Sequence, residues 1–197
     1  MTYSAPVDDI LLALKTVADL DGRLANGFYG DLDGATVAAV LDEAGKFAAD
    51  VLAPLNLIGD RAGAAWRDGR VTMPPGFADA YRRFAAGGWT ALPCSEAFGG
   101  QGLPEIVVTA VCEIWNAANL AFGICPLLTQ GAIHTIEAAG SQALKATYLP
   151  KMVAGVWTGT MNLTEPQAGS DLSLLKSKAE PAGDGTYRIT GTKIFIS

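Results

Sequence analysis

Apolar residues recur every three or four positions through most of residues 1–155, which is the spacing of amphipathic helices. The first helix is predicted to begin at Ser4-Ala5-Pro6, because a capping hydroxyl, an early proline and then acidic residues are typical of a helix N-terminus. Its buried face is predicted to consist of Ile10, Leu11, Leu14 and Val17. The glycine-rich residues 22–34 then predict a loop.

A second helix is predicted from about Ala35 to Val51, and Pro54 is expected to end it. Its apolar face is predicted to be Val37, Val40, Leu41, Ala44, Phe47 and Val51. Residues 56–75 show no periodicity and predict irregular surface.

Three further helices are indicated after this stretch. Aromatic residues at Phe77, Tyr81 and Phe84 predict a short helix that Gly87-Gly88 stops. Pro104 is expected to open a long helix, whose apolar face is predicted to be Val107, Val108, Val111 and Trp115. Ser141 is expected to cap another helix, which ends at Tyr148-Leu149-Pro150.

Residues 114–136 carry no formally charged side chain, and the stretch is long enough to span a bilayer. Polar side chains and two glycines, Gly123 and Gly131, interrupt it. We therefore interpret it as two buried helices joined by a turn at Cys125-Pro126, and we expect no membrane span.

The pattern changes near residue 156. β-branched residues with partial alternation predict a strand over 156–163. Asp184-Gly185 predicts a hairpin before a strand at 187–190, and a turn at Gly191 leads into a last predicted strand, 193–197.

These patterns predict an α+β fold in which an all-helical domain precedes the first strands of a small antiparallel β domain. The expected divisions are an N-terminal extension (1–34), the helical domain (35–155) and the start of the β domain (156–197). A last strand without a terminating turn indicates a truncated chain, because open strand edges are unfavourable.

Composition excludes several kinds of function. The net charge is −6 and the pI about 4.7, so no basic surface is available for nucleic acid. Three scattered cysteines and an N-terminus without a basic segment favour a cytoplasmic protein.

With a single histidine, His134, a histidine metal site is excluded and we expect no metal. His134 lies among apolar residues and is expected to be a core or pocket-rim side chain. No GxGxxG, P-loop or GxSxG motif is present.

The segment Leu163-Thr164-Glu165-Pro166-Gln167-Ala168-Gly169-Ser170-Asp171 is the most distinctive in the chain. Pro166 and Gly169 predict a sharp turn that exposes hydroxyls and backbone N–H groups. Such a turn could hold a polar ring or a phosphate, although the residues alone favour a plain capped turn.

Residues 161–171 resemble the flavin-binding signature of the acyl-CoA dehydrogenase family. Three more segments resemble motifs of that family in the same order: an acidic-Gly-Gly turn at 95–102, the last helix before the sheet at 148–155, and a G-x-K-x-[WF]-I-[ST] strand at 191–197. The start of the chain resembles the N-terminal extension of a large subgroup that includes methylthiopropionyl-CoA dehydrogenases.

The resemblance implies FAD as the cofactor. It places the Thr164 hydroxyl near flavin N5, and backbone groups of Met161, Leu163 and Thr164 near the pyrimidine end of the ring. Phe195 is expected to pack beside the flavin and Ser197 to contact it. The family usually has Trp and Thr at these last two positions, so both are conservative departures. Met161 replaces a commoner aromatic residue, which leaves a backbone contact there.

The resemblance also implies a substrate site. Ser170 matches a position that touches the thioester arm of coenzyme A or the flavin phosphates, and residues 114–136 are expected to line the acyl pocket. The implied partners are an acyl-CoA substrate, an electron-transfer flavoprotein and further copies of the chain in a dimer or tetramer.

The implied reaction is an α,β-dehydrogenation in fatty acid metabolism, by an oxidoreductase in which a carboxylate removes the α proton. The family's base is a glutamate in a C-terminal helical domain, so no catalytic residue is expected in this chain and the chain alone is expected to be inactive. Glu165 belongs to the turn motif and is not expected to be the base.

Two alternatives remain open from the sequence. One is a related flavoprotein with a DNA-associated or partner-binding role in place of the dehydrogenase reaction. The other is a complete, non-enzymatic helical module that binds a partner.

Overall fold

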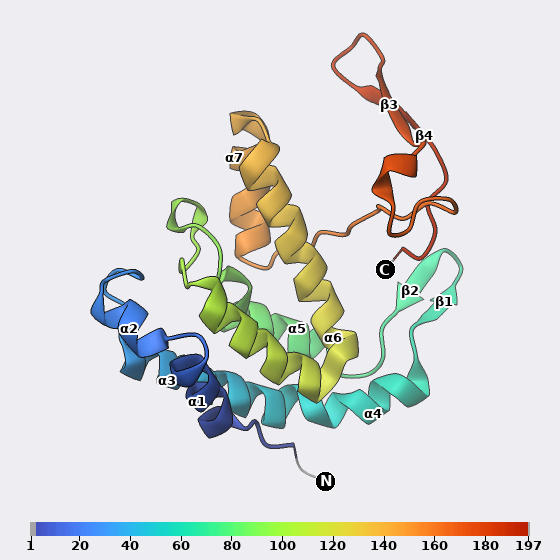
Figure 1. The fold of residues 1–197 in the computed structure, drawn as a ribbon. Helices are drawn as coiled ribbons and strands as arrows, with labels where there is room; N and C mark the ends of the chain where they lie inside the picture. Colours follow the sequence, from blue (N-terminus) through green and yellow to red (C-terminus); the bar gives the residue numbers. More distant parts are fainter. Residues whose placement is uncertain (1–2, 197) are drawn as a thin grey trace. The chain divides into compact units, whose positions relative to one another are not determined.

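The computed structural model describes residues 3–196. The described residues fall into two compact units that meet between Gly159 and Thr160. The first unit is mainly helical with one short hairpin, and the second carries another β-hairpin (Figure 1). The predicted α+β fold, helices first and strands afterwards, is confirmed.

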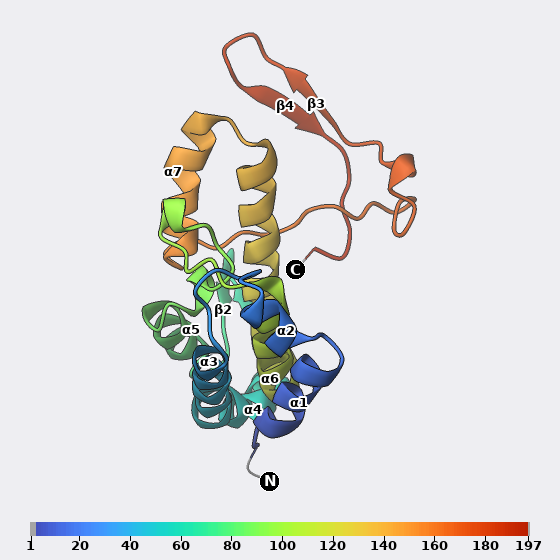
Figure 2. The same cartoon turned by 60° about the vertical axis from the view of Figure 1, so that its left-hand side comes forward.

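The elements of the first unit run in chain order along residues 7–153. They are α1 (Val7–Thr16), α2 (Leu20–Ala25), α3 (Gly34–Phe47), the π-helical turn η1 (Ala48–Leu52), α4 (Ala53–Ala62), β1 (Ala65–Arg67), β2 (Arg70–Thr72), α5 (Phe77–Ala86), the 3₁₀ turns η2 (Trp89–Ala91) and η3 (Glu96–Phe98), α6 (Glu105–Ala139) and α7 (Gln142–Val153). The long helix α6 runs through the unit, with α3 and α4 along its first half and α7 beside its second half (Figures 1 and 2).

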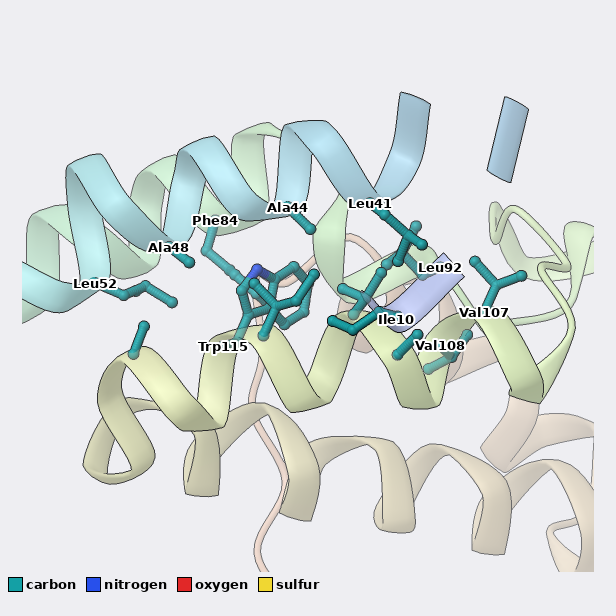
Figure 3. Packing of buried hydrophobic residues seen from close by; sticks show 14 of the residues in the cluster. Ile10, Leu41, Ala44, Ala48, Leu52, Phe84, Leu92, Val107, Val108 and Trp115 are labelled. Atoms are coloured by element: carbon teal, nitrogen blue, oxygen red, sulfur yellow. The ribbon is translucent and has the colours of Figure 1, made fainter. Parts of the chain in front are cut away.

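The core of this unit lies between α6 and the continuous run from α3 through η1. Apolar side chains from these elements point toward one another in Figure 3, among them Leu41, Ala44, Ala48, Leu52, Val107, Val108 and Trp115. Phe84 from α5 is fully buried at the centre. Its ring centroid lies 4.9 Å from that of Trp115 and 5.5 Å from that of Phe122. The predicted apolar faces of the short and long helices therefore do form the core.

The start of the chain differs from the prediction in two ways. Helix α1 begins at Val7, directly after Pro6, and no side chain caps it, so the predicted capping role of Ser4 is wrong. Ile10 and Leu14 are buried as predicted, but Val17 is 86% exposed because the helix has ended before it. The predicted loop at 22–34 begins inside α2, so its first part is helical.

Pro54 does not end the second helix. The chain passes from α3 through η1 into α4, and Pro54 lies in the first turn of α4. A proline lacks the N–H that a regular helix interior uses, so it is tolerated best where the hydrogen-bonding pattern already changes. The π-helical turn before it absorbs the change in hydrogen-bonding pattern.

Residues 56–75 are therefore ordered instead of irregular. Helix α4 continues to Ala62, and β1 and β2 pair antiparallel with Trp66 opposite Val71. Asp68 and Gly69 form the two-residue turn between them, both with positive φ (51° and 76°). An Asp-Gly pair is a strong hairpin signal because both positions need left-handed backbone.

The long apolar stretch bends at a different place from the one predicted. Helix α6 is broken at Asn119, where φ is −160° and ψ is 88°, while Cys125 and Pro126 lie within its second half. By length and composition α6 could cross a membrane, and half of its most apolar window is buried inside the chain.

Helix α7 starts where predicted, with the Ser141 hydroxyl oxygen accepting a hydrogen bond from the backbone N–H of Leu144. It does not end at Pro150 but continues to Val153.

The second unit contains the 3₁₀ turn η4 (Leu172–Leu174) and the strands β3 (Lys178–Pro181) and β4 (Tyr187–Thr190). The strands pair antiparallel, with Ala179 opposite Ile189, and the hairpin predicted at Asp184-Gly185 is confirmed.

Neither residues 156–163 nor residues 191–196 form strands, contrary to prediction. Strand propensity alone does not produce a strand, because each strand needs a neighbour to accept and donate its backbone hydrogen bonds. Ser197, the end of the last predicted strand, lies outside the described residues.

Candidate functional site

The second unit contains the predicted sharp turn at residues 165–168. The backbone N–H of Glu165 donates to the carbonyl of Ala168 at 3.1 Å, and the N–H of Ala168 donates back to the carbonyl of Glu165 at 3.0 Å. Pro166 occupies the turn, where its fixed φ is favourable. The Glu165 side chain points inward from this turn and is only 2% exposed.

Four donors surround the Glu165 carboxylate. Oε1 accepts from the Lys193 ammonium at 2.9 Å and from the Ser177 backbone N–H at 3.0 Å. Oε2 accepts from the Lys176 backbone N–H at 2.8 Å and from the Gln167 side-chain amide at 2.6 Å. A carboxylate has about four lone-pair positions, so its acceptor capacity is filled.

This environment holds the pKa of Glu165 well below its usual range. The Ser177 hydroxyl has the largest effect, followed by the Lys176 N–H and the Lys193 ammonium. The Ser177 Oγ itself makes no hydrogen bond of acceptable geometry in the described chain. The bonds from the two backbone N–H groups and from Lys193 are the firmer contacts, and they favour the ionised carboxylate by themselves.

Hydrogen bonds also join the two motif segments that lie far apart in sequence. The Lys193 ammonium donates to the carbonyl of Leu163 at 2.9 Å, and the backbone N–H of Ile194 donates to the carbonyl of Thr164 at 3.0 Å. The flavin-signature turn and the G-x-K segment therefore lie against each other.

Two of the predicted flavin contacts belong to these joined segments. Thr164 is half-buried, and in the described part of the chain its hydroxyl has no hydrogen-bond partner. Phe195 is 88% exposed and has a left-handed backbone with φ of 54°, which is unfavourable for an aromatic residue. Leu163 is half-buried beside them, and Met161 is exposed.

Ser170 is exposed beyond the turn, and Ser197 lies outside the described residues. The roles assigned to all of these residues by the resemblance remain predictions.

The two joined segments present three kinds of group that could contact a ligand: an exposed aromatic ring, a hydroxyl without a hydrogen-bond partner, and the backbone of the turn. A planar, polar-edged ring such as a flavin needs an apolar surface to stack on and donors for its heteroatoms. The side chains present at Thr164 and Phe195 fit that requirement.

The helical unit contains a pocket of about 90 Å³ formed largely by α6 and the segment after α5. Its walls are mainly apolar and aromatic, and include Phe84, Leu92, Val108, Trp115 and Phe122. Asn116 contributes an amide that makes no hydrogen bond among the described residues. The exposed His134 also lines the pocket, as the expected pocket-rim side chain. A mostly apolar pocket with few polar groups suits an acyl chain.

The acidic-Gly-Gly segment at 95–102 follows the pocket-lining residues Leu92 and Pro93 along the chain. The Gly102 N–H donates to the carbonyl of Cys94, and the Leu103 N–H to the carbonyl of Leu92, at 2.9 and 2.8 Å. At Gly100 a Cβ would lie 1.9 Å from the Cys94 carbonyl oxygen, so only glycine fits this close backbone approach. The segment thus fixes the chain next to the pocket-lining Leu92.

Other chemistry finds little support. Residues 3–196 contain no cluster of three or more side chains that could bind a metal. All three cysteines are free, and burial raises the pKa of the thiols of Cys94 and Cys112. Protonated thiols are poor nucleophiles, which argues against catalysis by these two cysteines.

A helical unit with an apolar pocket, followed along the chain by a turn-and-hairpin unit with an exposed aromatic ring, is the arrangement expected in a flavin-dependent dehydrogenase. Residues 35–156 match the family model of the acyl-CoA dehydrogenase N-terminal domain. The chain belongs to the acyl-CoA dehydrogenase family.

Individual relatives agree with this assignment. The chain is 48% identical over 197 residues to 3-methylmercaptopropionyl-CoA dehydrogenase of Ruegeria pomeroyi, covering all of this chain and 34% of the relative. It is 32% identical over 200 residues to a butyryl-CoA dehydrogenase of Syntrophomonas wolfei, covering 99% of this chain and 33% of the relative. The chain therefore spans about a third of the length of these relatives.

Solved structures show the same fold. Butyryl-CoA dehydrogenase of Megasphaera elsdenii has a TM-score of 0.70 at 26% identity, with 84% of this chain and 41% of that chain covered.

Sequence reasoning missed the central part played by Lys193 and by the amides of Lys176 and Ser177. A signal for Lys193 was present, since it is the one charged residue of the segment 191–197. Its partner Glu165, 28 positions earlier, is the one acidic residue between positions 163 and 170. No local pattern indicates the two backbone amides, because any residue supplies an N–H.

Proposed function

We propose that the protein containing this chain is an FAD-dependent acyl-CoA dehydrogenase that catalyses α,β-dehydrogenation of an acyl-CoA thioester. The observation that carries the proposal is the joining of the flavin-signature turn to the G-x-K segment through hydrogen bonds at Leu163 and Thr164. Family membership and the apolar pocket support it.

Each residue then has a defined task. Thr164 donates its hydroxyl toward flavin N5, with backbone groups of Met161 and Leu163 at the pyrimidine edge. Phe195 stacks beside the ring and Ser197 adds a polar contact. FAD, when bound, takes up the electrons removed from the acyl chain.

Ser170 is proposed to contact the thioester arm of coenzyme A or the flavin phosphates. The domain limits that accompany these roles are an extension at 1–34, a helical domain at 35–155 and a β domain beginning at 156.

Glu165 is unsuited to remove the α proton. A general base works best with a pKa near the operating pH and with a free lone pair directed at the substrate. The pKa of Glu165 is far lower, and its lone pairs are occupied by four donors. We place the base outside these 197 residues, as the family resemblance implies.

The relatives and the pocket support a proposal for the substrate class. We propose a short acyl-CoA, with 3-methylmercaptopropionyl-CoA as the first compound to test because the relative covering the whole chain is named for it. We further propose a cytoplasmic homo-oligomer that passes electrons to an electron-transfer flavoprotein.

The test uses the full-length purified protein. It should be yellow with a flavin spectrum, and an acyl-CoA should bleach that spectrum without oxygen. A flavoprotein that no acyl-CoA of any chain length bleaches would contradict the dehydrogenase and favour a flavoprotein with another role.

The role of Thr164 is tested by Thr164→Val, which removes the hydroxyl at nearly constant volume. We expect flavin reduction to slow at least tenfold, since one donor to developing charge is worth about that much or more. Thr190→Val, on the exposed face of β4, is the matched control. Unchanged flavin content and reduction rate in Thr164→Val would remove Thr164 from the site.

A further inference from the structure

The second unit has a charged centre where most folds have an apolar one. In its described part only two residues are buried, Glu165 and Ala168. The large apolar side chains of strand β4, Tyr187 and Ile189, are both exposed. An ionised carboxylate in such a position is unfavourable unless every lone pair finds a donor, and here each does.

The same carboxylate lies at the junction of the two flavin-signature segments. Glu165 follows Thr164 directly, and Lys193 precedes Phe195 by two residues. Lys193 bridges the segments, since its ammonium donates both to the Glu165 carboxylate and to the Leu163 carbonyl, each at 2.9 Å. Moving either charged group would displace the backbone that carries Thr164 or Phe195.

The backbone at Phe195 adds an independent indication. Its left-handed φ of 54° is costly for a non-glycine residue and persists only where surrounding contacts maintain it. The contacts on its N-terminal side are the Ile194 N–H bond to Thr164 and the Lys193 bridge.

We propose that Glu165 and Lys193 are positioning residues for the flavin: their ion pair holds the Thr164 hydroxyl and the Phe195 ring in the relative placement that FAD requires. The inference rests on the proposed function, because it assumes that FAD binds at these two residues. It gives Glu165, which is not expected to be the base, a structural task in the flavin site.

The experiment compares Glu165→Gln, Lys193→Met and Lys193→Arg in the full-length protein. The readouts are the FAD dissociation constant, the visible circular dichroism of bound flavin and the far-ultraviolet signal of the helices. Lys178→Met, at an exposed position in β3, is the matched control for loss of a lysine charge.

We expect Glu165→Gln and Lys193→Met each to weaken FAD binding at least tenfold and to change the visible circular dichroism of the remaining bound flavin. Lys193→Arg should restore most of both, because a guanidinium can donate to the carboxylate and to the Leu163 carbonyl together. The double variant Glu165→Gln/Lys193→Met should be little worse than either single variant, since the pair acts as a unit.

Two results would overturn the inference. The first is unchanged FAD affinity and flavin circular dichroism in Lys193→Met. The second is equal loss of FAD binding in all three variants, accompanied by loss of the helical signal, which would show a general folding role. Failure of the unaltered protein to bind FAD at all would instead contradict the proposed function.

Discussion

Asn119 is the residue whose replacement tests the helical unit most directly. It is 1% exposed and sits at the break in α6, where its side chain forms two hydrogen bonds. Its Oδ1 accepts from the backbone N–H of Phe122 at 3.0 Å, so it caps the second half of the helix. Its Nδ2 donates at 3.0 Å to the carbonyl of Leu52, the last residue of the π-helical turn.

Asn119→Ala removes both bonds. Loss of the cap costs about 1 kcal/mol. Leaving the Leu52 carbonyl without a donor in the core costs about 1–3 kcal/mol more. We therefore expect the free energy of unfolding to fall by about 2–4 kcal/mol, a large share of the stability of a typical domain.

Urea denaturation followed by far-ultraviolet circular dichroism is the appropriate assay, because the α-helices of the described chain all lie in the first unit and the signal reports on that unit. Asn56→Ala is the control, since Asn56 is exposed in α4 and its side chain forms no hydrogen bond within the described residues. Its stability should change by only a few tenths of a kcal/mol.

Asn119→Asp separates the two contributions. It keeps an oxygen to cap Phe122 but loses the donor to Leu52, so at neutral pH it should also destabilise the unit. A loss below about 0.5 kcal/mol for Asn119→Ala, or a loss as large in Asn56→Ala, would refute the account of the break.

The remaining predictions concern the ion-paired turn and the pocket. Folding lowers the pKa of Glu165, so the unfolded chain binds more protons at acidic pH. The stability that the ionised Glu165 contributes is therefore fully present at pH values above the ordinary carboxyl pKa, and it is lost as the pH falls toward the lowered pKa. Hydrogen-exchange protection of the Lys176 and Ser177 amides should therefore persist from pH 7 to about pH 4 and decline below it. If the Glu165→Gln variant showed the same decline, protonation of Glu165 could not be its cause. In the pocket, a Cβ at Gly123 would lie 1.9 Å from Asn116 Oδ1, so Gly123→Ala should push the amide into the 90 Å³ space and lower kcat/KM for the longest accepted acyl-CoA at least tenfold. Asn116→Ala should shift the preference toward longer chains, and an identical chain-length profile in both variants would exclude this pocket as the acyl site.

Local patterns predicted much of the helical unit correctly. The spacing of Phe77, Tyr81 and Phe84, the opening of α6 at Pro104 and the cap at Ser141 depend on interactions within one or two helical turns. The Asp184-Gly185 turn is equally local, because its backbone conformation selects those residue types.

The errors arose where a local signal competed with tertiary packing. Pro54 and Pro126 suggested breaks, yet both lie within helices: Pro54 follows the π-helical turn, at the start of α4, and Pro126 lies inside the second half of α6. The break in α6 fell at Asn119 instead, since a buried asparagine can bond to a neighbouring element as well as cap a helix. Residues 156–163 were predicted as a strand from composition, but no adjacent segment pairs with them.

By itself the sequence determined the order of helices and hairpin and the motifs whose order indicated the family, because these depend on composition or on neighbours along the chain. Tertiary structure decided which of the turn's polar groups is buried and what it binds. Glu165 and Lys193 are 28 positions apart, and their pairing depends on the approach of two segments that no local rule relates. The same approach gave Glu165, which the sequence placed only in a turn, a buried position with four hydrogen-bond donors.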